Sequence, residues 1–89
     1  MKSIDFITIH NTGNYNATAN AKAHANLLYS GTGGSSWHYS VDSNEVWQSF
    51  EDDRQCWHAW DGNNGIGNST SIGIEICVND KVHFPKACD

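Results

Sequence analysis

The stretch SIGIEICV, Ser71 to Val78, organises the predicted fold. Its bulky apolar residues alternate with smaller or polar ones, which is the pattern of a β-strand with two different faces. One face of this strand carries Ile72, Ile74, Ile76 and Val78, and the other carries Ser71, Gly73, Glu75 and Cys77. Because glycine has no side chain, Gly73 leaves room near the Glu75 carboxylate. We therefore expect one apolar face and one face with space around an acidic group.

A second strand is predicted at residues 4–10, where the sequence FITIHNTGN places a histidine at the end of an apolar run. By the same period of two, one face carries Phe6, Thr8 and His10, and the other carries Ile7 and Ile9. Turn-forming residues follow the histidine at once. Functional residues are common where a strand gives way to a loop, so His10 is a candidate site residue.

The sequence between these two strands predicts one helix and one hairpin. A stripe of alanines and one leucine predicts a helix over residues 17–29, which Asn16 can cap and Gly31 can end. Residues 36–41 and 45–50 are predicted strands, and the three residues between them are typical of a hairpin turn. Residues 51–71 form a long irregular segment, which in a small domain is usually a functional loop.

These elements predict a single α/β domain over residues 1–89, with a mixed central sheet and a flanking helix. No second helix is evident to cover the other face of the sheet. That face is therefore expected either to be exposed or to be covered by another chain.

The composition excludes several classes of function. A formal net charge of −5 argues against nucleic-acid binding, which needs a basic surface. No apolar segment approaches the length of a membrane span, and the first ten residues do not resemble a signal peptide, so we expect cytoplasmic synthesis. The three cysteines are an odd number without close pairing, which argues against a disulfide scaffold. Four tryptophans are many for 89 residues, and tryptophan serves as core or as a stacking surface for sugars.

Five groups of titratable or metal-binding side chains are candidates for chemistry: His10, His38, His58, Glu75, and His83 with Cys88. A catalytic zinc takes three protein ligands and one water, and a nearby glutamate can accept and return the proton of that water. The spacing alone is a weak signal, because the chain has no HExxH or CxxC motif. On the residues alone, ordinary surface and loop histidines are the favoured interpretation.

Four short segments, in order, resemble the type-2 N-acetylmuramoyl-L-alanine amidases, a family of phage endolysins, bacterial autolysins and peptidoglycan-recognition proteins. The segments are FITIHNT at 6–12, SSWHYSVD at 35–42, CWHAWDGNNGIGN at 56–68 and SIGIEIC at 71–77. The resemblance covers nearly the whole chain. It implies an α/β, amidase-like fold that is incomplete at the C-terminus, lacking the helix and strand that follow in the family.

The resemblance also implies roles for individual residues. His10 matches a zinc ligand, and Glu75 matches the catalytic glutamate. His38, His58 and Trp60 match positions that we assign to substrate binding. Trp37 and Trp57 are further candidates for the walls of a substrate groove, with core packing as the alternative.

The C-terminal segment VHFPKACD departs from the family, whose remaining two ligands lie farther downstream. In one interpretation, His83 and Cys88 are a compressed version of those ligands. In the other, residues 84–89 begin the helix that follows in the family, and Pro85 suits the first turn of a helix. We favour the second interpretation.

The implied function is zinc-dependent hydrolysis of the amide between N-acetylmuramic acid and L-alanine in peptidoglycan, by this chain or by an enzyme of which it is one part. The implied cofactor is Zn²⁺, and the implied site of action is the bacterial cell wall. A complementary C-terminal chain or a second copy is the expected protein partner, with no nucleic acid and no membrane. The alternative function is a non-catalytic peptidoglycan-binding module.

Overall fold

The computed structural model describes residues 1–31 and 34–89. In chain order its elements are β1 (Phe6–Asn11), α1 (Ala21–Ser30), β2 (Tyr39–Val41), β3 (Val46–Gln48), α2 (Ile66–Thr70), β4 (Ser71–Ile76) and α3 (Phe84–Cys88). Four strands form one sheet in the order β1-β4-β2-β3. β4 pairs in parallel with both β1 and β2, and β2 pairs with β3 as an antiparallel hairpin. The segment SIGIEICV therefore does lie at the centre of a mixed α/β sheet, as its alternation predicts.

Helix α1 starts four residues later than the sequence pattern predicts. The side chain of Asn20, rather than Asn16, accepts the capping hydrogen bond, from the Ala23 N–H at 2.9 Å. Asn16 instead accepts from the Thr18 N–H and closes a local turn before the helix. The predicted cap was therefore wrong. Asn16 and Asn20 are four residues apart and can both cap a helix, but the side chain of Asn16 is used in the preceding turn, so the helix begins after Asn20. Gly31 ends the helix in a left-handed conformation with φ 69°, which confirms the predicted stop.

Helix α2 lies in the segment that the sequence analysis treats as irregular. Two of its first N–H groups, on Gly67 and Asn68, donate to the two carboxylate oxygens of Asp61 at 2.7 and 3.1 Å. The helix has five residues, one of them glycine, so it carries too little periodicity to be recognised from the sequence. A carboxylate several residues upstream satisfies its free N–H groups.

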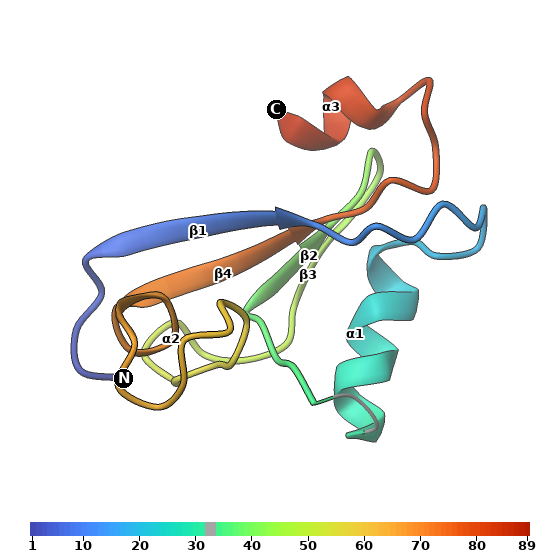
Figure 1. The fold of residues 1–89 in the computed structure, drawn as a ribbon. Helices are drawn as coiled ribbons and strands as arrows, with labels where there is room; N and C mark the ends of the chain where they lie inside the picture. The colour runs from blue at the N-terminus through green and yellow to red at the C-terminus, as the bar shows by residue number, and fades with distance from the viewer. Residues whose placement is uncertain (32–33) are drawn as a thin grey trace.

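The two faces of the sheet differ in their covering. Figure 1 shows α1 and α2 on one side of the strands and α3 on the other. Helix α1 packs against β2 and β3, and its His24 ring reaches the thiol of Cys77, with Nδ1 3.8 Å from Sγ. On the opposite face, Ile7 and Ile9 are 64% and 63% exposed. Ile76, on the same face at the end of β4, and Val78 just beyond it are buried. Among the described residues, the apolar face is therefore exposed along β1, whereas α3, which the sequence pattern does not predict as a cover, lies on this side of the sheet.

Asp42 joins the helix to the hairpin. One of its carboxylate oxygens accepts from the Ala21 N–H at 2.9 Å, and the other accepts from the N–H groups of Asn44 and Glu45 at 2.7 Å each. Burial by itself raises the pKa of this carboxyl group, but the three N–H donors outweigh it and hold the pKa below its ordinary 3.8. One side chain thus orders both the start of α1 and the β2–β3 turn.

Replacing Asp42 with alanine is expected to lower the free energy of unfolding by about 1–2 kcal/mol at pH 7, because three N–H groups lose their acceptor. Since the folded-state pKa is lowered, the advantage of the wild type is present above pH 3.8 and disappears as the pH falls through the folded-state value. Urea denaturation at several pH values measures both effects. Asp53→Ala, at an exposed position, is the control, and an equal loss in both variants would contradict the role of Asp42.

Candidate active site

His10 and Glu75 lie side by side at the centre of the candidate site. The parallel register of β1 and β4 pairs His10 with Glu75, and it pairs Thr8 with Gly73. Paired residues on neighbouring strands project to the same face, and the strands are about 4.8 Å apart. The imidazole and the carboxylate therefore share one face of the sheet, which is the arrangement that the sequence hypothesis requires.

His58 reaches this pair from the long loop between β3 and α2. Its Nδ1 lies 3.2 Å from Nε2 of His10, and the two rings meet edge to face with centroids 5.4 Å apart. In such a contact one nitrogen donates and the other accepts, so the two rings cannot both be fully protonated. Burial lowers the pKa of His58, and the neighbouring His10 and His38 lower it further. His58 is thus held as a neutral ring that orients His10.

Gly73 makes this position of His58 possible. A Cβ atom added at residue 73 would lie 2.6 to 2.9 Å from three atoms of the His58 ring, which is closer than van der Waals contact permits. The alternation of β4 predicts space beside Glu75 on this face, and the His58 ring fills the part of that space above Gly73. Gly73 is therefore needed because any larger residue at this position would displace the His58 ring.

His38 occupies a different place from the other two histidines. Its side chain is fully buried, with Nε2 2.6 Å from the Arg54 carbonyl and Nδ1 2.9 Å from the Gly73 N–H. These partners define one neutral tautomer, in which Nε2 donates and Nδ1 accepts. Both ring nitrogens of His38 thus form hydrogen bonds within the protein, one to the loop at Arg54 and one to β4 at Gly73. Neither nitrogen is left to bind a substrate.

Two buried polar atoms lie unpaired in the site. Oε2 of Glu75 and Nε2 of His58 have no hydrogen-bond partner among the described residues. The Ser71 backbone is near enough to His58 to raise its pKa weakly, but it does not form a hydrogen bond of normal geometry. Burial raises the pKa of Glu75 from 4.5 to about 7. Unpaired buried groups are costly and concentrate at functional sites, and a carboxyl group that titrates near neutrality can take up and return a proton.

A hollow of about 430 Å³ adjoins this cluster. Its walls include His58, Trp57 and Trp60, and the Trp60 ring is 93% exposed on a residue with φ 60°. Such a strained backbone persists only where its surroundings enforce it, and it is common at ligand sites. Trp37 is different: it is buried, and its indole N–H donates to the Ser40 hydroxyl at 2.9 Å. Trp37 therefore belongs to the core, and not to a groove wall.

Asn68 is a supporting residue that the sequence analysis did not single out. It is buried, and its side-chain oxygen accepts from the N–H groups of both His58 and Ala59 at 2.8 and 2.9 Å. The position of His58 thus depends on α2, which carries Asn68. An asparagine in a glycine-rich loop has the composition of an ordinary turn, so no sequence signal marks it.

The described residues do not complete a zinc site. They contain no group of three histidine, cysteine or acidic side chains placed to hold a metal ion. His83 is exposed and bonds to Asp80, with Nδ1 2.6 Å from Oδ2, and Cys88 is exposed at the end of α3. Helix α3 starts at Phe84 with Pro85 in its first turn, as the favoured interpretation of the tail predicts. The unpaired Glu75 and the adjacent His10 fit part of such a site.

Residues 1–88 match the family Amidase_2, described as N-acetylmuramoyl-L-alanine amidase. The chain belongs to this family. Two similar proteins of Bacillus subtilis (strain 168) are the N-acetylmuramoyl-L-alanine amidases CwlH, 46% identical over 82 residues, and XlyA, 48% identical over 82 residues. Each match covers 92% of this chain, but only 33% of CwlH and 27% of XlyA.

Solved amidase structures share the fold. A mutant endolysin from Bacillus subtilis has a TM-score of 0.88 at 46% identity, over 94% of this chain and 54% of that one. The catalytic domain of XlyA has a TM-score of 0.87 at 44% identity, over 98% of this chain and 57% of that one. The predicted α/β fold with a mixed sheet is therefore confirmed. The chain spans between about a quarter and a third of the length of these curated relatives and slightly more than half of the solved chains.

Proposed function

We propose that this amidase chain supplies the proton-transfer half of a peptidoglycan hydrolase site, which cleaves the amide between N-acetylmuramic acid and L-alanine. The observation that carries the proposal is the pairing of His10 with Glu75 on one sheet face, with Glu75 Oε2 buried and unpaired. Glu75 accepts a proton from the attacking water and returns it to the leaving amine. The bacterial cell wall is the proposed site of action.

The neighbouring residues have supporting roles in this proposal. His58 orients His10 and also borders the hollow, where Trp60 and Trp57 offer aromatic surfaces to the substrate. His38 positions the loop against β4 instead of touching substrate, because both of its nitrogens are bonded within the protein.

We further propose that His10 is one ligand of a Zn²⁺ ion. The chemistry that zinc supplies in hydrolases is polarisation of a carbonyl and a lowered pKa of bound water. Because the described residues lack three ligands in one group, the remaining ligands are assigned to polypeptide outside these 89 residues. The exposed isoleucines and the unpaired outer edge of β1 are consistent with further polypeptide packing there, either a C-terminal segment or a second chain.

A peptidoglycan-binding module without catalysis is the second candidate function. The incomplete ligand set favours it. The unpaired Glu75 carboxyl opposes it, because a site that only binds gains nothing from a costly buried acid.

Zinc affinity and cleavage of purified cell walls test this proposal, measured on the wild type and two histidine variants, each with the polypeptide that completes the site. His10→Ala is expected to weaken zinc binding about tenfold or more, since a direct ligand is lost. His83→Ala is the matched control and should leave the affinity unchanged, because His83 is exposed and pairs with Asp80. Unchanged affinity in His10→Ala would remove His10 from the metal site, and a loss in His83→Ala would restore the compressed-ligand interpretation. Wall binding with neither zinc nor cleavage would support the binding module.

A further inference from the structure

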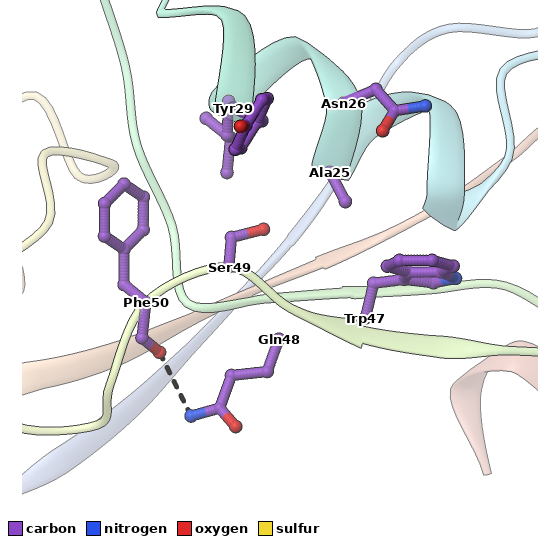
Figure 2. Close-up of a pocket in the computed structure, with 8 residues that line it drawn as sticks. Ala25, Asn26, Tyr29, Trp47, Gln48, Ser49 and Phe50 are labelled. Atoms are coloured by element: carbon purple, nitrogen blue, oxygen red, sulfur yellow. Dashed lines mark hydrogen bonds between the residues drawn. The ribbon is translucent and has the colours of Figure 1, made fainter.

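A second hollow, of about 400 Å³, lies between α1 and the end of β3, and we call it the α1–β3 pocket. It is lined by Asn26 and Tyr29 of α1 and by the consecutive residues Trp47, Gln48, Ser49 and Phe50. Figure 2 shows Phe50 and Trp47 at opposite ends with Ser49 between them, and Tyr29 and Asn26 on the facing wall. None of the residues that the resemblance assigns to the site lies in this pocket.

The aromatic walls of the α1–β3 pocket suit a ligand with apolar faces. The Tyr29 ring is 95% exposed and therefore offers its surface without any rearrangement. Trp47 is held in place, because its indole N–H donates to the Glu45 carboxylate at 2.6 Å and Lys22 Nζ lies 5.9 Å from the ring centroid. Sugar rings stack on such surfaces through their C–H faces.

The remaining lining groups are neutral and polar. The Asn26 side chain has no hydrogen-bond partner in the part of the chain that the structure describes. The Gln48 amide donates to the Phe50 carbonyl at 3.1 Å, which leaves its oxygen free to accept. The Ser49 hydroxyl belongs to a lining residue and is buried without a partner among the described residues, so a ligand that reaches it would relieve this cost. Amides and hydroxyls of this kind match the acetamido and hydroxyl groups of an N-acetylated sugar.

Contacts through the buried His38 link the wall of the pocket to the candidate active site. The Ser49 N–H donates to the His38 carbonyl at 2.8 Å, and the His38 ring centroid is 6.3 Å from that of His58. The α1–β3 pocket and the hollow beside Trp60 therefore lie on either side of the short segment that ends in His38.

We propose that the α1–β3 pocket binds an N-acetylated sugar of the glycan strand, away from the amide that is cleaved. The choice of polymer rests on the proposed function. A stem peptide suits the pocket less well, because no lining residue is charged, Lys22 lies only at the edge over Trp47, and the chain has a net charge of −5.

The test is a titration of the ¹⁵N-labelled full chain with a soluble β-1,4-linked trimer of N-acetylglucosamine. We expect saturable shifts of the Asn26 and Gln48 side-chain amide signals. Tyr29→Ala should weaken binding about tenfold, since one stacking ring is lost. This variant should fold normally, because the Tyr29 side chain is almost wholly exposed. Tyr15→Ala, at another exposed tyrosine outside the pocket, is the control and should bind like the wild type.

The outcomes separate this subsite from the proposed function. Absence of saturable shifts, shifts confined to the Trp60 indole signal, or unchanged affinity in Tyr29→Ala would each overturn the subsite. Shifts of the pocket amides by a free stem peptide, and not by the sugar trimer, would assign the pocket to peptide instead. Because the titration requires no hydrolysis, a chain that binds the trimer through Tyr29, but never cleaves walls when zinc and the polypeptide that completes the site are supplied, would keep the subsite and refute the catalytic proposal.

Discussion

Glu75→Gln is expected to reduce the rate of amide hydrolysis about 10²–10⁴-fold, which is the usual contribution of a positioned acid–base group. Glutamine keeps the size of the side chain but can neither accept nor return the proton. The measurement is the release of new alanine amino groups from purified walls, with zinc supplied and with the polypeptide that completes the site. A variant that cleaves at the wild-type rate would exclude Glu75 from proton transfer.

The same substitution has a second effect that requires no metal. The pKa of Glu75 is raised from 4.5 to about 7 by burial, so its contribution to stability is complete below pH 4.5 and is lost as the pH rises through about 7. Relative to Glu75→Gln, the free energy of unfolding of the wild type should fall by about 1–2 kcal/mol across this window, a value discounted because the carboxyl group is only partly shielded from water.

Urea denaturation of the wild type and variant between pH 4 and pH 8 tests this expectation, with roughly one measurement per pH unit across the titration window. Glu51→Gln, at an exposed glutamate, is the matched control and should follow the wild type. Parallel stability curves for the wild type and Glu75→Gln would mean that Glu75 has an ordinary pKa and is not buried as the structure shows.

Gly73→Ala is expected to lower the free energy of unfolding by about 1–3 kcal/mol, the usual cost of inserting a methyl group into a packed site. The new methyl would overlap three atoms of the His58 ring, so the ring must leave its place against β4. His58 would then lose its 3.2 Å contact with His10. Chemical denaturation measures the loss of stability, and the imidazole signals of the two histidines report the separation of the rings.

Gly34→Ala is the control for this substitution, because a Cβ at residue 34 meets no atom within 4 Å. Its stability should stay within about 0.5 kcal/mol of the wild type. If Gly73→Ala were equally harmless, His58 could not lie against β4 as described. If it lost stability but kept both histidine signals unchanged, the clash would be absorbed elsewhere in the sheet.

The central pairing of the site was open to prediction from the sequence. Alternation along two strands places His10 and Glu75 on the chemically distinct face of each strand, and the four short segments point to the family. The environments of His38 and His58 could not be predicted from the sequence. His38 lies in a predicted strand and His58 in the long irregular segment, and each follows a tryptophan, yet His38 is locked in the core and His58 contacts His10. Their environments depend on how the loop between β3 and α2 folds back over β4.

The sequence by itself determined the features that depend on local geometry: strand periodicity, the glycine that ends α1, the hairpin turn and the apolar face that is exposed along β1. These follow from backbone geometry and from the spacing of side chains within a few residues. Only the tertiary structure decided that Asn68 holds the loop, that His58 fills the space above Gly73, and that α1 leaves a pocket against β3. Each of these features depends on contacts between segments that are distant in the chain. The sequence around a polar residue does not reveal which distant partner it contacts, so these contacts could not be predicted.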